Sequence, residues 1–168
     1  MVSSFYRRRL ALSCTSSACA GSIFPHLRAR YPDGWLEVSL HTTSAPTVEI
    51  RNNLVTGNFE GRFTFSVQRP NGNRIATNTG DAKFSVPLVT YIRNNIIRAY
   101  PRGSRITVTR VFGINTVTTA QAQQALAIFQ HGFMLSRLYE LGRQGFPLPS
   151  FRGVTFQSPS IEIGDVSD

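Results

Sequence analysis

The sequence predicts an α+β domain in which a run of antiparallel strands is followed by one long apolar helix. Residues 59–68 and 105–112 alternate apolar and polar side chains, the pattern of a half-buried strand. Between residues 118 and 141 the apolar residues change to helical spacing. Because 168 residues are enough for one domain with a substantial core, and no internal repeat separates these segments, we expect a single folded unit.

The elements that precede the long helix follow from local patterns. Ile23, Phe24 and Leu27 share one side of a short helix over residues 22–31, and Pro32–Asp33–Gly34 then forms a turn. Residues 91–100 fit a strand or a helix, and we favour a strand. The strands that alternation or β-branched composition indicates are residues 36–41, 48–50, 59–68, 83–97 with a break at Pro87, and 105–112.

The long helix is predicted to begin after Thr118 or Thr119, either of which can cap it, and to end near Gly142. Apolar residues cover more than half of its circumference, and they are Leu126, Ile128, Phe129, Phe133, Met134, Leu135, Leu138 and Leu141. A helix that is apolar on nearly all sides must be surrounded by other elements. It is therefore either wrapped by a curved sheet or an ordinary buried helix.

The segment after the helix is an apolar connector followed by short strands. Two prolines keep residues 146–149 extended, so the helix cannot continue through them. Val154 with Phe156, and Ile161 with Ile163, then alternate as two closing strands. An apolar connector requires a cover, since most connectors are polar.

The charge of the chain is strongly basic. It has 18 Lys and Arg against 9 Asp and Glu, and every basic residue except Lys83 is arginine. Such a chain suits anionic partners, namely nucleic acid, anionic lipid headgroups or glycans.

Cys14 and Cys19 lack a zinc-ligand pattern, and we interpret them as free or incidental. Apolar runs are too short to span a bilayer, and residues 7–14 do not form a convincing secretion signal.

The motifs of common enzymes are missing from the sequence. It contains no nucleophile elbow, no zinc-protease helix and no phosphate-binding glycine loop. His26, His41 and His131 fall in unrelated segments, and spacing implies no catalytic carboxylate pair. We therefore expect a binding protein with no catalytic residue, no metal and no cofactor.

Three kinds of binding protein fit these patterns. A curved sheet around the helix would leave an apolar groove for lipid. A basic sheet could bind nucleic acid, but that needs aromatic and basic side chains on one face, and Phe63 and Phe65 alternate with Arg62. A protein-interaction domain without a small ligand is the third.

Two stretches of the chain carry a resemblance to a known family. "RLYELGRQGFPLPSFRGVTFQSPSIEI" resembles the C-terminal signature of the bactericidal/permeability-increasing protein and lipopolysaccharide-binding protein family, in which a long helix ends in a basic turn before Gly-Phe-Pro-Leu-Pro and two strands. "SIFPHLRARYPDGWLEVSLHTTSAPTVEI" is similar to the family's short helix, strand and crossover, and "FEGRFTFSVQRPNG" to the next strand and turn. These matches follow the family's order over residues 21–163.

The resemblance implies a tubular lipid-binding domain of the super-roll type, in which a highly twisted antiparallel sheet wraps the helix around an apolar cavity. It covers the C-terminal half of the family only, so we expect a partial domain over residues 21–168 and an extension of unknown structure over residues 1–20. It also implies an extracellular protein of the lipid-transfer and innate-defence type. Its partners would be phospholipid or lipopolysaccharide, and an anionic membrane surface, with nucleic acid disfavoured.

Two groups of residues are candidates for contact with such a ligand. The expected lipid-lining residues are Leu126, Phe129, Phe133, Met134 and Leu138 of the helix, with Phe146 and Leu148 of the connector. The alternative is that these side chains form only the core. The expected headgroup contacts are Arg93, Arg98, Arg102 and Arg105, which surround the Tyr100–Pro101 turn, and the alternative for them is a solvated surface.

Overall fold

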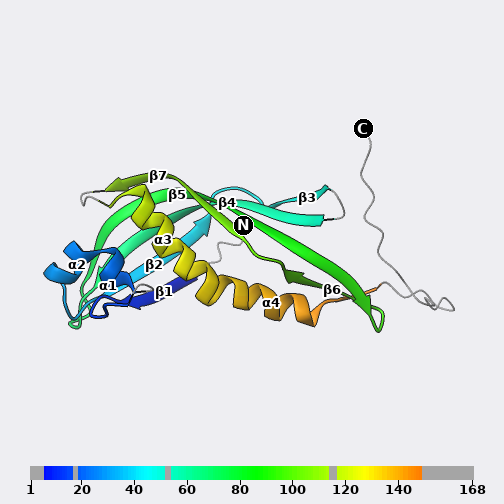
Figure 1. The fold of residues 1–168 in the computed structure, drawn as a ribbon, viewed down its shortest axis with the longest axis horizontal. Helices are drawn as coiled ribbons and strands as arrows, with labels where there is room; N and C mark the ends of the chain where they lie inside the picture. Colours follow the sequence, from blue (N-terminus) through cyan, green and yellow to red (C-terminus); the bar gives the residue numbers. More distant parts are fainter. Residues whose placement is uncertain (1–5, 17–18, 52–53, 114–116, 149–168) are drawn as a thin grey trace.

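The computed structural model describes residues 6–16, 19–51, 54–113 and 117–148, which form an elongated, curled antiparallel sheet with helices along its concave side (Figure 1). This confirms the predicted fold class. In chain order the elements are β1 Tyr6–Ala11, α1 Ala20–Ile23, α2 Pro25–Arg30, β2 Trp35–Thr42, β3 Thr47–Arg51, β4 Leu54–Gln68, β5 Arg74–Arg93, β6 Ile96–Pro101, β7 Arg105–Gly113, α3 Thr119–Phe129, a π-helical turn Gln130–Met134, α4 Leu135–Gln144 and β8 Phe146–Pro147.

Two long strands, β4 and β5, run through the whole sheet and divide its other strands into two groups. β2 pairs with the second part of β4 and β7 with the first part of β5, which gives a proximal half of order β1-β2-β4-β5-β7. β3 pairs with the first part of β4 and β6 with the last part of β5, which gives a distal half of order β3-β4-β5-β6-β8. In Figure 1 the proximal half lies on the left, curling around α3, and the distal half lies on the right beside α4.

The hydrophobic core fills the concave side of the proximal half. Strand alternation sends Phe63 and Phe65 of β4 inward, and both are fully buried against Leu126 and Phe129 of α3. Phe24, between α1 and α2, packs edge-on against Phe65 with ring centroids 5.6 Å apart. Burial of each such side chain stabilises the fold by roughly 1.5–3 kcal/mol. The proximal half is therefore the closed end of the molecule.

The short N-terminal helix is broken in two. Pro25 lacks a backbone donor, and Phe24 leaves the helical region with φ −121° and ψ 68°. Residues 22–31 therefore form the end of α1 and all of α2, where one helix was predicted. The first twenty residues, which the sequence left without an assigned structure, include β1, and β1 pairs with β2 from Tyr6 opposite Leu40 to Ala11 opposite Trp35.

The hairpin between β5 and β6 confirms the preference for strand over most of residues 91–100. It also corrects the single strand predicted over residues 83–97, because a turn divides that range and β5 continues through Pro87, where a break was expected. Asn94 and Asn95 both have positive φ, at 53° and 58°, and Arg93 lies opposite Ile96. Two consecutive left-handed residues form the turn that matches the twist of antiparallel strands, and asparagine adopts that conformation more readily than most residues.

The long helix begins as predicted but differs in its middle and at its end. Thr118 caps α3 through a reciprocal capping box with Gln121. The helix continues through Gly142 to Gln144, so the predicted stop at Gly142 is wrong. Gly142 lies against the backbone of Ala99 in β6, where only hydrogen fits, and Gly145, with φ 71°, supplies the left-handed residue that ends the helix. The strands expected at residues 154–163 lie outside the described residues.

The interpretation of the cysteines as free or incidental is wrong, because Cys14 and Cys19 form a disulfide. β1 ends at Ala11 and α1 begins at Ala20, and the turn between them brings the two Cα atoms to 5.9 Å. Cys19 also caps α1, since its sulfur accepts a hydrogen bond from the Gly21 amide at 3.3 Å. The disulfide therefore ties the edge strand to the first helix.

Replacement of both cysteines by serine is expected to lower the free energy of unfolding, because the cross-link no longer restricts the unfolded chain. The loss should be about 2 kcal/mol, at the lower end of the usual range, since the disulfide closes a loop of only a few residues. Serine preserves a side-chain acceptor for the Gly21 amide, so the change reports mainly on the cross-link. Urea unfolding of the wild type and of C14S/C19S measures the difference. Equal midpoints, or two titratable thiols in the folded wild type, would contradict the disulfide.

Candidate functional site

An apolar pocket of about 340 Å³ lies between the concave face of the sheet and the long helix, where the proximal and distal halves meet. The sheet supplies one wall, the helix the opposite wall, and the connection from β2 to β3 the rim. The lining residues are Leu40, Val48, Gly57, Phe59, Val86 and Leu88 from strands, Phe129, Met134, Arg137 and Leu138 from the helix, and Thr42, Pro46 and Thr47 at the rim. We call this the apolar pocket.

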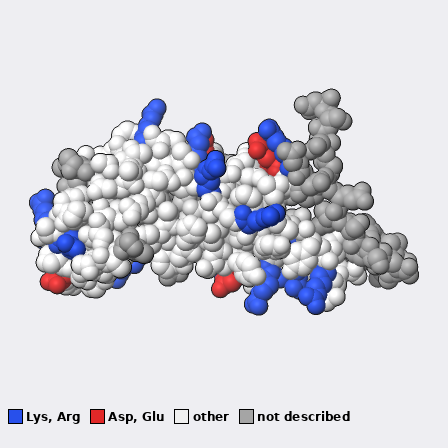
Figure 2. All heavy atoms as spheres, in the orientation of Figure 1, with Lys and Arg blue, Asp and Glu red and all other residues white. Residues whose placement is uncertain are grey.

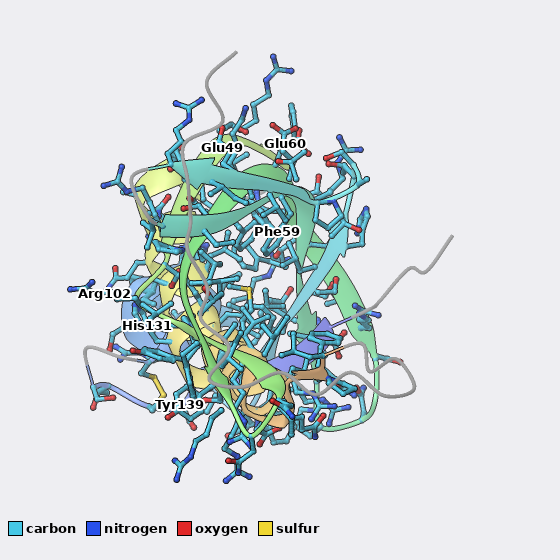
Figure 3. All side chains as sticks on the ribbon, turned by 90° about the vertical axis from the view of Figure 1, so that its right-hand side faces the viewer. Glu49, Phe59, Glu60, Arg102, His131 and Tyr139 are labelled. Carbon is cyan, nitrogen blue, oxygen red and sulfur yellow. A yellow bond between two sulfur atoms is a disulfide. The ribbon has the colours of Figure 1, made fainter. Side chains whose placement is uncertain are left out.

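The strand wall follows from alternation along β4 and β5. Gly57 and Phe59 face inward with Val86 and Phe84 opposite them in register, so one continuous apolar surface spans both strands. Phe59 stacks on Phe84 with ring centroids 4.6 Å apart and ring planes 4° from parallel. Figure 3, viewed from the distal side, shows Phe59 near the centre of the curled sheet.

Gly57 leaves part of this wall empty. A Cβ atom at this position would meet only the carbonyl oxygen of Val86, at 4.0 Å. Val48 of β3 lies opposite Gly57 in register and also lines the apolar pocket. The pocket therefore exists partly because glycine stands where the alternation would otherwise place an inward side chain.

The helix wall depends on the π-helical turn at Gln130–Met134. In a continuous α-helix, Phe133 and Arg137 would stack beneath Phe129 at intervals of four residues. The wider turn contains one additional residue, so Met134 follows Phe129 at a spacing of five, and Leu138 follows Met134 at a spacing of four. This shift aligns the three apolar side chains that line the pocket.

The charged side chains are arranged outside the apolar pocket. Arg137 is its one ionisable lining residue among those the structure describes, and its guanidinium pairs with Glu140 at 2.9 Å. On the convex face, Lys83 pairs with Glu60 at 2.8 Å and Arg62 with Asp81 at 2.9 Å. The hydrogen bond to Asp81, with the charge of that carboxylate, raises the pKa of Arg62. Among the described lining residues the apolar pocket thus has Arg137 as its single charge, whereas the convex surface carries cross-strand ion pairs.

The structure separates the predicted lipid-lining residues into three groups. Phe129, Met134 and Leu138 line the apolar pocket. Leu126 is fully buried in the core, and Phe133 packs beside Phe129 with ring centroids 6.2 Å apart. The two connector residues lie away from the pocket: Phe146 pairs with Ile97 in β8 and is largely exposed, and Leu148 is half-buried with its amide bonded to Asn95.

The four predicted headgroup arginines do not line the apolar pocket. Arg93 and Arg98 lie on the β5–β6 hairpin, and Arg102 follows the end of β6. Arg105, at the start of β7, borders a different, polar hollow on the convex face together with Lys83 and Glu49. Arg93 and Arg98 therefore lie toward the tip of the distal hairpin, Arg102 lies at its base, and Arg105 lies on β7.

Sequence reasoning missed the strand wall of the apolar pocket. Alternation in β4 indicated which residues share the face of Phe63 and Phe65, and Gly57 and Phe59 fall on that face. The alternation therefore identified the inward face, but the position of the helix decides which part of that face forms the core and which part borders a pocket.

The described residues contain no group of three or more His, Cys, Asp or Glu placed to hold a metal. Their helices are all too short or too polar to cross a membrane.

The fold and the apolar pocket define a curled-sheet domain with a ligand-sized interior. The chain belongs to the LBP/BPI/CETP family, because residues 5–165 match the profile of its C-terminal domain. This confirms the family resemblance seen in the sequence. A solved structure of lipopolysaccharide-binding protein superposes with a TM-score of 0.62 at 14% identity, over 86% of this chain and 34% of that one. The chain therefore spans about a third of that protein's length. Comparison with curated protein sequences gives no significant match.

Proposed function

We propose that the chain binds a lipid without catalysis, with an acyl chain of a phospholipid or of a lipopolysaccharide-like amphiphile in the apolar pocket. The observation that carries the proposal is the composition of the lining, in which Arg137 is the single charged residue. Membership of the LBP/BPI/CETP family and the likeness to a lipopolysaccharide-binding protein support it.

The size of the apolar pocket is consistent with part of an acyl chain. Its volume of about 340 Å³ lies within the range of small-molecule sites. Each methylene transferred from water to an apolar environment contributes about 0.8 kcal/mol, so eight methylenes contribute roughly 6 kcal/mol before the cost of ordering the chain. That is enough for a lipid to be retained, with the remainder of the molecule extending past the rim.

Arg137 is the residue best placed to contact an anionic headgroup at the mouth of the apolar pocket. Its partner Glu140 lies one turn further along α4, and both side chains are about half exposed, so the ion pair can exchange at little cost. A phosphate is a good bidentate acceptor for a guanidinium. The roles expected for Arg93, Arg98, Arg102 and Arg105 as headgroup contacts stay predictions.

Two further features support an extracellular, non-catalytic protein. Disulfides persist in oxidising compartments, and Cys14 and Cys19 form one. His26, His41 and His131 lie on three different elements, α2, β2 and the π-helical turn. We therefore propose lipid carriage or recognition of the lipid-transfer and innate-defence type, and no reaction.

The experiment is native mass spectrometry of the purified chain, followed by organic extraction and identification of the lipid. We expect a fraction of the folded protein to carry one phospholipid or lipid A molecule that is released on unfolding. A folded monomer that stays empty after incubation with phospholipid and with lipopolysaccharide would overturn the proposal.

A further inference from the structure

The distal end of the molecule combines unpaired positive charge with exposed aromatic side chains. We define the distal end as the β5–β6 hairpin, residues 91–102, together with the last turn of α4 and β8, residues 141–147. β6 joins the two parts, because it pairs with β8 and packs against α4, with Gly142 of the helix lying on the backbone of Ala99. These three elements therefore form one end of the molecule, with the convex face of the hairpin on one side and α4 on the other.

Within the described residues, the positive charge at the distal end has no acidic partner. Arg93, Arg98, Arg102 and Arg143 make no ion pair with any described residue, whereas five of the other basic residues pair with a carboxylate on the sheet. Glu140 is the single acid between residues 82 and 148, and it already pairs with Arg137. Figure 2 shows basic side chains gathered along the lower right of the molecule, where α4 runs in Figure 1, and Figure 3 shows Arg102 at the periphery, directed outward.

Exposed apolar and aromatic residues lie among these arginines. Tyr91 and Tyr100 project from the convex face of the hairpin with ring centroids 6.1 Å apart, and both are more than a third exposed. Arg98 lies directly opposite Tyr91. At the end of α4, Leu141 is 45% exposed, and Phe146 in β8 is 76% exposed. Four of the nine exposed large hydrophobic residues that the structure describes therefore lie in this one region.

We infer that the distal end docks on the surface of an anionic phospholipid membrane. Tyrosine is enriched at membrane interfaces because its ring is apolar and its hydroxyl is polar. Arginines without acidic partners are attracted to the negative surface potential of an anionic leaflet. The exposed phenylalanine at the same end of the molecule, Phe146, adds apolar contact below the headgroups. The surface goes beyond the apolar pocket and is formed by different residues, so the inference does not depend on lipid uptake.

The test is co-sedimentation of the full chain with sucrose-loaded vesicles of phosphatidylcholine with or without phosphatidylglycerol. The wild type is expected to bind the anionic vesicles, with an affinity that falls as salt rises. R93Q/R98Q/R143Q is expected to bind about a hundredfold more weakly, since each charge near an anionic surface is worth about a fivefold change. The single variant F146S is expected to bind anionic vesicles more weakly than the wild type, most clearly at high salt, where the apolar contact dominates.

The matched control removes three arginines elsewhere. Arg28 and Arg30 lie on α2 and Arg110 on β7, so R28Q/R30Q/R110Q has the same net charge as the distal variant. The control is expected to bind much as the wild type does, and thermal melts check that both variants fold. Equal weakening of vesicle binding in the two triple variants would mean that net charge alone drives binding, and would overturn the inference. A wild-type protein that does not bind anionic vesicles, or that binds a DNA duplex more tightly than the vesicles, would also overturn it. Native mass spectrometry of the distal variant checks the apolar pocket separately. The variant should still carry the pocket lipid, so weaker vesicle binding would not reflect loss of that lipid.

Discussion

Gly57→Leu is expected to weaken phospholipid binding about a hundredfold without damage to the fold. The new side chain would enter the apolar pocket from the strand wall and displace about four carbons of the acyl chain, at about 0.8 kcal/mol each. Among the described residues, a Cβ at this position would have one heavy atom within 4 Å, the carbonyl oxygen of Val86 at 4.0 Å. Leucine also has a lower conformational cost than glycine in a strand, so the thermal midpoint should stay the same or rise. Titration with a fluorescent phosphatidylcholine measures the affinity.

The control for this substitution is its neighbour on the opposite face. Thr56 pairs with Pro87 and Glu49 on the convex side of β4, so Thr56→Leu adds a similar apolar group outside the apolar pocket. T56L should bind the fluorescent lipid like the wild type. If G57L binds as tightly as the wild type, or if T56L weakens binding to the same degree, the ligand does not occupy this pocket.

Gly142→Ala is expected to lower the free energy of unfolding by about 3 kcal/mol, the upper part of the usual range for overpacking. A Cβ atom there would overlap the carbonyl oxygen of Ala99, which is backbone and cannot rotate away. α4 must then move from β6, and with it Arg137 and Leu138 of the pocket wall. For a chain of this size the midpoint of thermal unfolding should fall by about 10 °C. Circular dichroism and the same lipid titration measure both effects.

Gly132 provides the comparison on the same helix. It lies in the π-helical turn, is exposed, and a Cβ atom there would have no neighbour within 4 Å. Gly132→Ala should therefore keep or raise the stability, because alanine favours the helical backbone. A G142A protein as stable as G132A would mean that α4 does not rest on β6 as described.

The strands and the long helix could be predicted because each has one buried face. Phe63, Phe65 and Val67 alternate with polar residues, and the capping box at Thr118 marks the helix start in four residues of sequence. Local patterns of this kind do not show where one element rests against another. Gly142 illustrates the limit: its place after a helical pattern favours a stop, and only the position of β6 shows that it is a packing residue.

The candidate site was predicted on its helix side alone. Phe129, Met134 and Leu138 line the apolar pocket, and the resemblance and the helical pattern both pointed to them. A π-helical turn leaves no clear trace in apolar spacing, so Phe133 could not be told from Met134. The strand wall required the register of β3, β4 and β5, which brings Val48, Gly57 and Val86 side by side across three strands. The disulfide could not be predicted either, because the spacing of Cys14 and Cys19 does not show whether the chain between β1 and α1 brings their Cα atoms close enough to bond.

The most direct test is photo-crosslinking with a phosphatidylcholine that carries a diazirine near the end of one acyl chain. After irradiation, the labelled residues are identified by peptide mass spectrometry. If lipid fills the apolar pocket, labels are expected on its walls, at Phe59, Phe129, Met134 or Leu138, and they should be lost in G57L. Labels confined to the convex face of the sheet, or an unchanged pattern in G57L, would contradict lipid binding in the pocket.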